Sequence, residues 1–152
     1  MKYIICLIIA SMILSNLAIA KDGVFISLPD KRVAVLSEGD LERNSIGSYS
    51  VVVFKDAALI DFEAGVVFSR DGTIFQDNGK PRVKFADITG DGTKELIISK
   101  LTAGSGNYLE VDVLRINAHS IRLLIRLNLN TKDDEIAMLK MACQRRRWTL
   151  CH

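Results

Sequence analysis

Residues 108–116, YLEVDVLRI, alternate in polarity, and this alternation decides the fold class. Successive side chains of a β-strand point to opposite faces, so a period of two predicts a strand with one apolar face and one solvent-exposed face. The first face carries Leu109, Val111, Val113 and Arg115, and the second carries Tyr108, Glu110, Asp112 and Leu114.

Similar alternation, or short β-branched runs, recurs from Gly23 to about Leu129. The dipeptides Asp71-Gly72 and Asn78-Gly79 favour tight turns between antiparallel neighbours. We therefore expect an all-β fold, an antiparallel β-sandwich of about eight to ten short strands. The expected strands are Val24–Leu28, Arg32–Leu36, Ser50–Phe54, Ala58–Phe62, Val66–Ser69, Thr73–Gln76, Arg82–Ala86, Glu95–Lys100, Tyr108–Ile116 and Ile121–Asn128.

The two ends of the chain differ from this pattern. Residues 1–20 hold one lysine and an apolar run ending in Ala-Ile-Ala, which predicts a secretory signal peptide cleaved before Lys21 rather than a membrane anchor. We expect residues 21–132 to form the β-sandwich domain. In the tail, residues 133–152, we expect a short helix over Asp133–Met141 or an irregular end.

Charge and cysteine content narrow the class of protein. Without Lys2, the 20 basic and 18 acidic residues become 19 and 18, a net charge of +1 that gives no support for nucleic-acid binding. Export permits oxidation, so we expect a disulfide between Cys143 and Cys151. The two histidines, His119 and His152, offer no convincing catalytic triad, and we expect no enzyme activity.

An acidic turn precedes one of the strands, in residues 87–99, DITGDGTKELIIS. Its oxygen-bearing side chains at odd positions could surround one calcium ion. Alternatively, Asp87 and Asp91 accept backbone N–H bonds in an Asx-type turn, while Gly90 and Gly92 take strained angles. The candidate metal ligands are Asp87, Thr89, Asp91 and Glu95.

The next connection, residues 103–109, reads AGSGNYL and has little side-chain bulk. A slim backbone can enter a narrow cavity, and the hydroxyls of Ser105 and Tyr108 can donate hydrogen bonds to a carboxylate without adding charge. The alternative is an ordinary glycine-rich hairpin in which Tyr108 simply begins the next strand.

The signal peptide, the β pattern, the acidic turn and the sequence Ser105-Gly106-Asn107-Tyr108 together resemble the periplasmic inhibitors of invertebrate-type (i-type) lysozyme, which carry a Ser-Gly-x-Tyr motif. The resemblance covers mainly Arg82–Ile116. It implies a periplasmic or secreted β-sandwich whose motif loop enters the lysozyme cleft, with Ser105 and Tyr108 bonding near the catalytic acids. It also implies a homodimer. Apart from the calcium considered for the acidic turn, we expect no cofactor, and we expect no membrane contact after cleavage.

The acidic turn also resembles the calcium loop of FG-GAP-like repeats. On that alternative the chain is a calcium-binding module for adhesion or surface assembly. Repeat arrays need several units to cover their cores, and no second D-x-T-G-D-G occurs in the chain. The sequence therefore favours the lysozyme inhibitor.

Overall fold

The computed structural model describes residues 21–42, 46–68, 73–76, 78–102 and 108–145. The predicted signal peptide, residues 1–20, and residues 146–152 lie outside this part of the chain. Within it the elements are β1 (Lys21–Ser27), β2 (Arg32–Glu42), β3 (Ile46–Lys55), β4 (Ala58–Phe68), β5 (Val83–Ala86), β6 (Glu95–Leu101), β7 (Tyr108–Ile116), β8 (Ile121–Asn130) and α2 (Glu135–Arg145).

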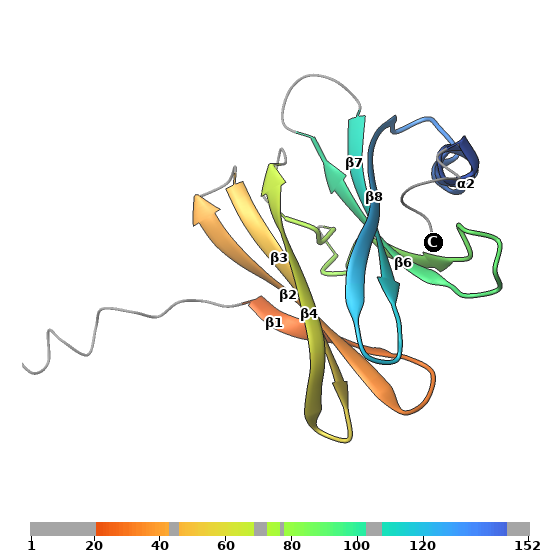
Figure 1. The fold of residues 1–152 in the computed structure, drawn as a ribbon. Coiled ribbons are helices and arrows are strands. Elements are labelled where there is room, and N and C mark those ends of the chain that lie inside the picture. The colour runs from red at the N-terminus through yellow and green to blue at the C-terminus, as the bar shows by residue number, and fades with distance from the viewer. Residues whose placement is uncertain (1–20, 43–45, 69–72, 77, 103–107, 146–152) are drawn as a thin grey trace, which may run out of the picture.

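The strands form two antiparallel sheets of four, in the orders β1-β2-β3-β4 and β5-β6-β7-β8 (Figure 1). We call these the first and the second sheet. Within each sheet every strand pairs with its neighbours in the sequence, as the turn signals predict, and the chain passes from the first sheet to the second between β4 and β5. The expected antiparallel β-sandwich is confirmed.

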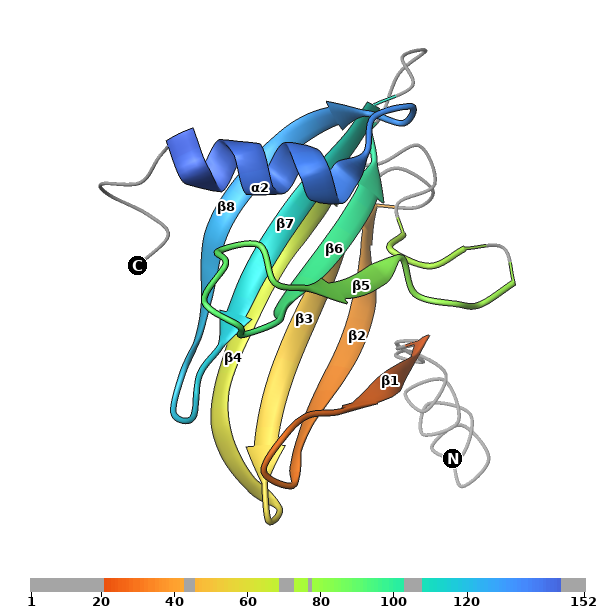
Figure 2. The same ribbon diagram turned by 90° about the vertical axis from the view of Figure 1, so that its right-hand side faces the viewer.

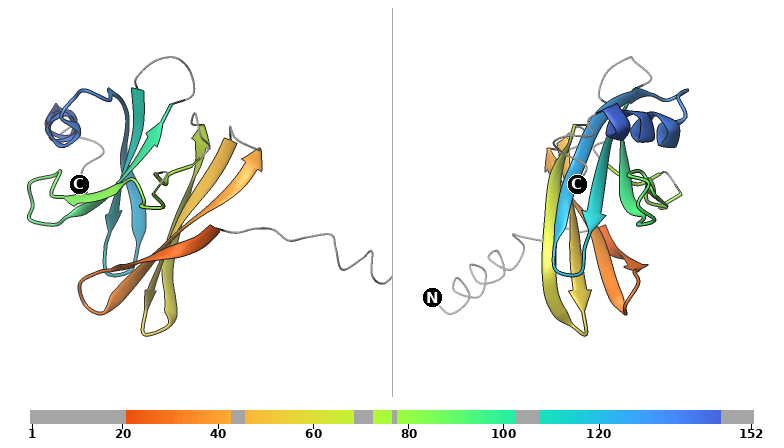
Figure 3. Two further views of the ribbon diagram at one scale, coloured as in Figure 1. Left: turned by 180° about the vertical axis from the view of Figure 1, so that it is seen from behind. Right: turned by 45° about the vertical axis from the view of Figure 1, so that its right-hand side comes forward.

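One apolar core lies between the two sheets, which face each other in Figure 3. Alternate residues of β2 and β3, such as Leu36, Val51 and Val53, meet Leu96 and Leu114 of the second sheet. All five side chains are fully buried. The period of two therefore places one face of each sheet in a shared interior.

A second core lies on the other side of the second sheet, where α2 crosses the strands (Figure 2). Leu139 and Cys143 of the helix pack in the same cluster as Ile97, Val111 and Val113. The helix covers the face on which the sequence places Val111 and Val113. It therefore adds a third layer to the sandwich.

This third layer corrects the expectation of a solvent-exposed face on residues 108–116. The alternation itself is present, but residues 111–115 are all buried, because the first sheet covers one face and α2 the other. A strand buried on both faces normally reads as continuously apolar. Here Asp112 and Arg115 interrupt that run, and both find charged partners inside the protein.

Two strand assignments also differ from expectation. The predicted strand Ala58–Phe62 and the described part of the predicted strand Val66–Ser69 belong to one strand, β4, which ends at Phe68. It stays paired to β3 throughout and contains a bulge opposite Val53 and Phe54. Thr73–Gln76 is not a regular strand: Phe75 forms one isolated bridge with Pro81. The backbone N–H of Ile74 donates instead to the Glu38 carboxylate, at 3.1 Å.

The turns and the helix follow local chemistry. Gly79 takes a positive φ of 77°, as the Asn-Gly signal predicts, whereas Asp71-Gly72 lies outside the described residues.

The tail contains the expected helix, and Asp134 caps it by accepting from the backbone N–H of Ala137 at 3.1 Å. No helix in the described ranges is long and apolar enough to cross a membrane.

Candidate functional site

The candidate loop joins β6 to β7 at one end of the second sheet (Figure 1). Ser105, Gly106 and Asn107 lie outside the described residues, so their predicted roles stay predictions. Tyr108, the first residue of β7, has a side chain that is 52% exposed. A tyrosine at a strand end that keeps half its surface in water has apolar area and a hydroxyl available for a partner.

The backbone beneath Tyr108 is held from both sides. The N–H of Thr102 donates to the Tyr108 carbonyl at 3.0 Å, and the Thr102 hydroxyl donates to the same oxygen at 3.2 Å. On its other edge Tyr108 pairs with Asn130 of β8. Register is strongly specified where strands are buried, so the point at which the loop leaves the sheet is fixed.

A group of interacting polar side chains lies just below this point, on the face of the second sheet that meets the first. Lys100, only 1% exposed, donates to Asp112 at 2.8 Å and also pairs with Glu110. Arg126 binds Asp112 with two nitrogens, at 2.6 and 2.9 Å. We call Tyr49, Lys100, Glu110, Asp112 and Arg126 the interior charge cluster.

Tyr49 connects this cluster to the first sheet. Its hydroxyl donates to Asp112 at 2.7 Å, and the Lys100 ammonium lies 5.6 Å from the centre of its ring. The absent side chain of Gly65 makes room for the ring, because a Cβ at that position would lie 2.5 Å from Tyr49. The cluster therefore joins β3, β6, β7 and β8 at the loop end of the sandwich.

The electrostatics keep Asp112 ionised although it is fully buried. Burial alone would raise the pKa of Asp112, but hydrogen bonds from Arg126 and Lys100 outweigh burial and lower it. The hydrogen bond to Asp112 raises the pKa of Arg126. Burial and the neighbouring Asp112 charge raise the pKa of Tyr49. At neutral pH, neutral Tyr49 therefore donates to an ionised Asp112.

The sequence prediction missed this cluster because it placed Asp112 in solvent. The sequence did contain a signal for the cluster. Lys100 comes two residues after the apolar run 96–98, and Glu110 and Asp112 alternate with apolar residues in the next strand. Cross-strand pairs with opposite charge stabilise sheets. The register confirms that Lys100 lies directly opposite Glu110, and Asp112 opposite Arg126.

The acidic turn is at the opposite end of β6 from the candidate loop. Asp87 accepts from the backbone N–H groups of Gly90 at 2.6 Å and Gly92 at 2.9 Å. Both glycines take positive φ, 80° and 86°. Asp91 likewise accepts from Thr93 at 2.8 Å, which lowers the pKa of Asp91. These bonds are those of the Asx-type turn.

The remaining oxygens of the turn surround a guanidinium group. Arg115 of β7 contacts Thr89 at 2.7 Å, Asp91 at 2.8 Å and Glu95 at 2.5 Å through one nitrogen, Nη2. The other oxygen of Glu95 accepts from the backbone N–H of Ile88 at 2.8 Å. Although burial opposes it, the bond to Glu95 raises the pKa of Arg115.

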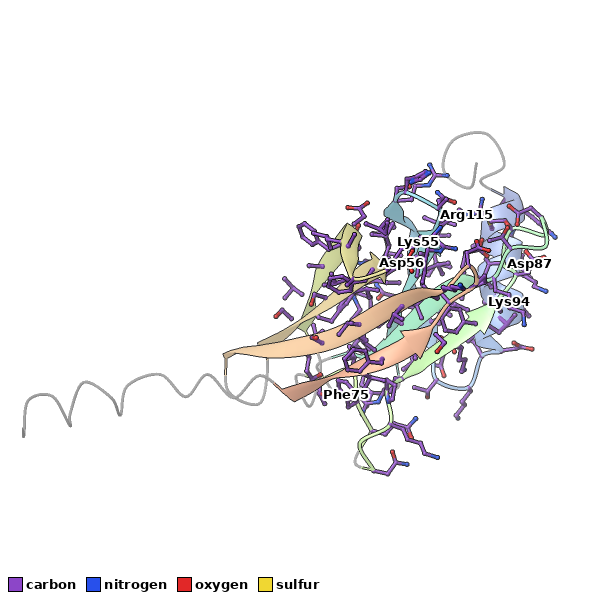
Figure 4. The ribbon with its side chains drawn as sticks, turned by 90° about the horizontal axis from the view of Figure 1, so that it is seen from below. Lys55, Asp56, Phe75, Asp87, Lys94 and Arg115 are labelled. Atoms are coloured by element: carbon purple, nitrogen blue, oxygen red, sulfur yellow. The ribbon has the colours of Figure 1, made fainter. Side chains whose placement is uncertain are left out.

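The cationic Arg115, labelled in Figure 4, thus contacts three of the four candidate metal ligands. The described part of the chain holds no group of three or more acidic, histidine or cysteine side chains arranged for a metal. The geometry favours the structural turn. Calcium binding at Asp87, Thr89, Asp91 and Glu95 stays an untested alternative.

Only one cysteine of the predicted disulfide, Cys143, lies within the described residues. Cys143 is buried in the core beneath α2, with 4% of its surface exposed. Cys151 lies outside the described residues, and the pairing stays a prediction.

Comparison with known proteins agrees with this arrangement. Residues 20–143 match the family model described as periplasmic lysozyme inhibitor of I-type lysozyme. A search of curated proteins gave no significant match.

Two solved structures of an Aeromonas hydrophila inhibitor are similar to this chain. One, PliI-Ah, a periplasmic lysozyme inhibitor of I-type lysozyme, is 29% identical with a TM-score of 0.63, covering 77% of this chain and 98% of its own. The other, PliI in complex with Meretrix lusoria lysozyme, is 30% identical with a TM-score of 0.60, covering 78% of this chain and 94% of its own. The chain therefore belongs to the family of periplasmic lysozyme inhibitors of I-type lysozyme, whose members are inhibitors rather than enzymes.

Proposed function

We propose that this protein inhibits an i-type lysozyme in the periplasm by inserting residues 105–108 into the glycan cleft of the enzyme. Family membership and the similar structure bound to a lysozyme support inhibition. The observation that carries the loop assignment is the exposed side chain of Tyr108 at the start of β7, a strand paired to β6 and β8. A bacterium that makes this protein would keep its peptidoglycan intact when the enzyme reaches the envelope.

The chemistry of the loop suits a cleft that contains carboxylates. Residues 101–108 include no acidic side chain, so no like charge opposes the approach to the catalytic acids of a lysozyme. The hydroxyls of Ser105 and Tyr108 are neutral donors, and the tyrosine ring adds apolar contact area. Gly104 and Gly106 keep the backbone thin enough to enter.

The fixed base of the loop contributes to affinity in a second way. Binding is weakened by the entropy that flexible groups lose at an interface, and a preorganised segment loses less. The interior charge cluster and the Thr102–Tyr108 bonds hold the strands from which the loop leaves. Buried anchor residues commonly contribute about 2 to 4 kcal/mol each to binding, so two anchors on a rigid base can dominate the affinity.

The first test replaces Ser105 and Tyr108 together with alanine. We expect the inhibitory concentration against an i-type lysozyme to rise at least about tenfold, a change of about 1.4 kcal/mol. His119→Ala is a matched control, because His119 is also exposed but lies in the turn at the opposite end of β7. Equal inhibition by the double variant and the control would remove the loop from the mechanism.

A second test adds charge instead of removing contacts. Asn107→Asp places a carboxylate in the centre of the loop, where it would face the acids of the enzyme. We expect weaker inhibition, and the loss should shrink at high salt if repulsion causes it. Inhibition at the parental level would show that residue 107 does not approach those acids.

Specificity is tested with a panel of invertebrate, chicken and goose lysozymes. We expect inhibition of the invertebrate type. A protein that inhibits none of the three but binds calcium in a calorimetric titration would instead support the FG-GAP-like alternative.

A further inference from the structure

A groove of about 710 Å³ opens between the edges of the two sheets, far along the molecule from Tyr108. It lies where the β1–β2 turn of the first sheet faces β5 and the acidic turn of the second, the end seen in Figure 4. Its size falls in the range of small-molecule sites, roughly 300 to 1,000 Å³.

The apolar wall of the groove is an uncovered part of the core between the sheets. Phe85 of β5 pairs with Leu96, which is fully buried in that core, so both side chains point toward the first sheet. Yet Phe85 is 39% exposed. Leu28 and Ile116, each at the margin of the same core, line the groove beside it.

The charges of the groove all have one sign. Among the described residues, nine line the groove, and they include two cations, Arg32 and Lys94, and no carboxylate. Arg32 is only 8% exposed because it occupies an inward position of β2. A buried charge is costly unless an opposite charge compensates it.

Arg32 finds little compensation within the described residues. Two of its nitrogens donate to neutral acceptors, the carbonyls of Pro29 and Asn117. The nearest carboxylate, Asp30, is 3.9 Å from the third nitrogen and largely in solvent, where a single ion pair contributes little. The guanidinium therefore retains a favourable interaction for an incoming anion.

We propose that this groove is a binding site for a small amphiphilic carboxylate, with the anionic head group at Arg32 and Lys94 and the apolar body against Phe85. The positive charges of the groove favour an anionic head group, and its exposed apolar wall favours an apolar body. The site is separate from the inhibitory loop, so ligand and lysozyme can bind at the same time.

Calorimetric titration of the full protein with decanoate, kept below micelle formation, tests the proposal. Decyltrimethylammonium has the same tail and the opposite charge, and we expect its Kd to be at least tenfold higher. Lys94→Glu should raise the Kd for decanoate at least fivefold. Lys132→Glu, the same charge change at another exposed lysine, should leave it within twofold.

Phe85→Ala tests the apolar wall, and we expect at least a threefold rise in the decanoate Kd. The thermal midpoint of each variant checks that it is folded. No detectable decanoate binding to the wild-type protein would overturn the proposal. It would also be overturned by equal binding of the two amphiphiles, or by equal losses in the two lysine variants.

Discussion

The two sheets share one interior but differ on their outer faces. The second sheet turns Ile97, Val111 and Val113 outward, and α2 covers them. The outer face of the first sheet carries a row of four apolar residues, one from each strand, and no element of the described chain covers this row. The four residues, each paired with the next, are Phe25, Val35, Val52 and Phe62. Phe25 and Phe62 are 76% and 62% exposed.

This difference shows that alternation identifies the faces of a strand but not what covers them. Both outer faces are apolar, and in both the pattern would predict burial. In the second sheet the covering element is the helix that follows β8 in the chain. In the first sheet no described element covers the apolar row, and large exposed apolar patches commonly mark interaction sites.

The largest expected effect comes from the covered sheet. Asp112→Ala removes the carboxylate that Tyr49, Lys100 and Arg126 all contact. Removing one partner from a buried ion pair leaves an uncompensated charge, so we expect the free energy of unfolding to fall by about 3 to 5 kcal/mol. Urea denaturation measures it. A loss below about 1 kcal/mol would mean that solvent reaches Lys100.

The next effect concerns the helix layer. Leu139 is fully buried against the second sheet, and Leu139→Ala should lower the free energy of unfolding by about 3 kcal/mol. Met138→Ala is the control on the same helix, because Met138 is partly exposed and should cost less than about 1 kcal/mol. Equal losses would show that α2 does not cover the sheet in solution.

The pH dependence of the free energy of unfolding tests the lowered pKa of Asp112. Its pKa is lower in the folded protein than its ordinary value of 3.8, so its contribution to stability is complete above that value and is lost as the pH falls through the folded pKa. The unfolding free energies of the wild-type protein and Asp112→Asn should therefore converge as the pH falls below about 4. A constant difference from pH 7 to pH 2 would contradict the lowered pKa.

The smallest effect on stability is expected from the uncovered sheet. Phe25→Asp with Phe62→Asp should change the free energy of unfolding of the monomer by less than about 1 kcal/mol, because both side chains are exposed. The homodimer expected from the family resemblance would find its apolar contact area here. Sedimentation should then show a dimer for the parent and a monomer for the variant; an unchanged mass would exclude this face as the contact.

Much of the fold could be predicted from local patterns. The alternation in residues 108–116, the positive φ of Gly79 and the start of the helix near Asp134 all agree with the structure. The position of the β3–β4 turn was predicted, between the expected strands Ser50–Phe54 and Ala58–Phe62, but its backbone conformation could not be predicted in this way. Asp56 and Ala57 have φ of 49° and 65°, and alanine carries no turn signal for such angles.

The candidate site was predictable in part. The loop motif and Tyr108 can be found in the sequence, because their chemistry lies in neighbouring residues. The interior charge cluster depends on a contact between Tyr49 and Asp112, which are 63 residues apart. The groove at Arg32 likewise depends on where two sheet edges meet. Such features need the packing of the sheets, which the sequence pattern does not contain.

Competition with a chitooligosaccharide that fills the glycan cleft of an i-type lysozyme tests the central claim most directly. If residues 105–108 enter that cleft, the apparent Kd of the inhibitor should rise in proportion to the occupancy of the oligosaccharide, with no ternary complex. An unchanged Kd, with inhibitor and oligosaccharide bound together, would contradict insertion of the loop.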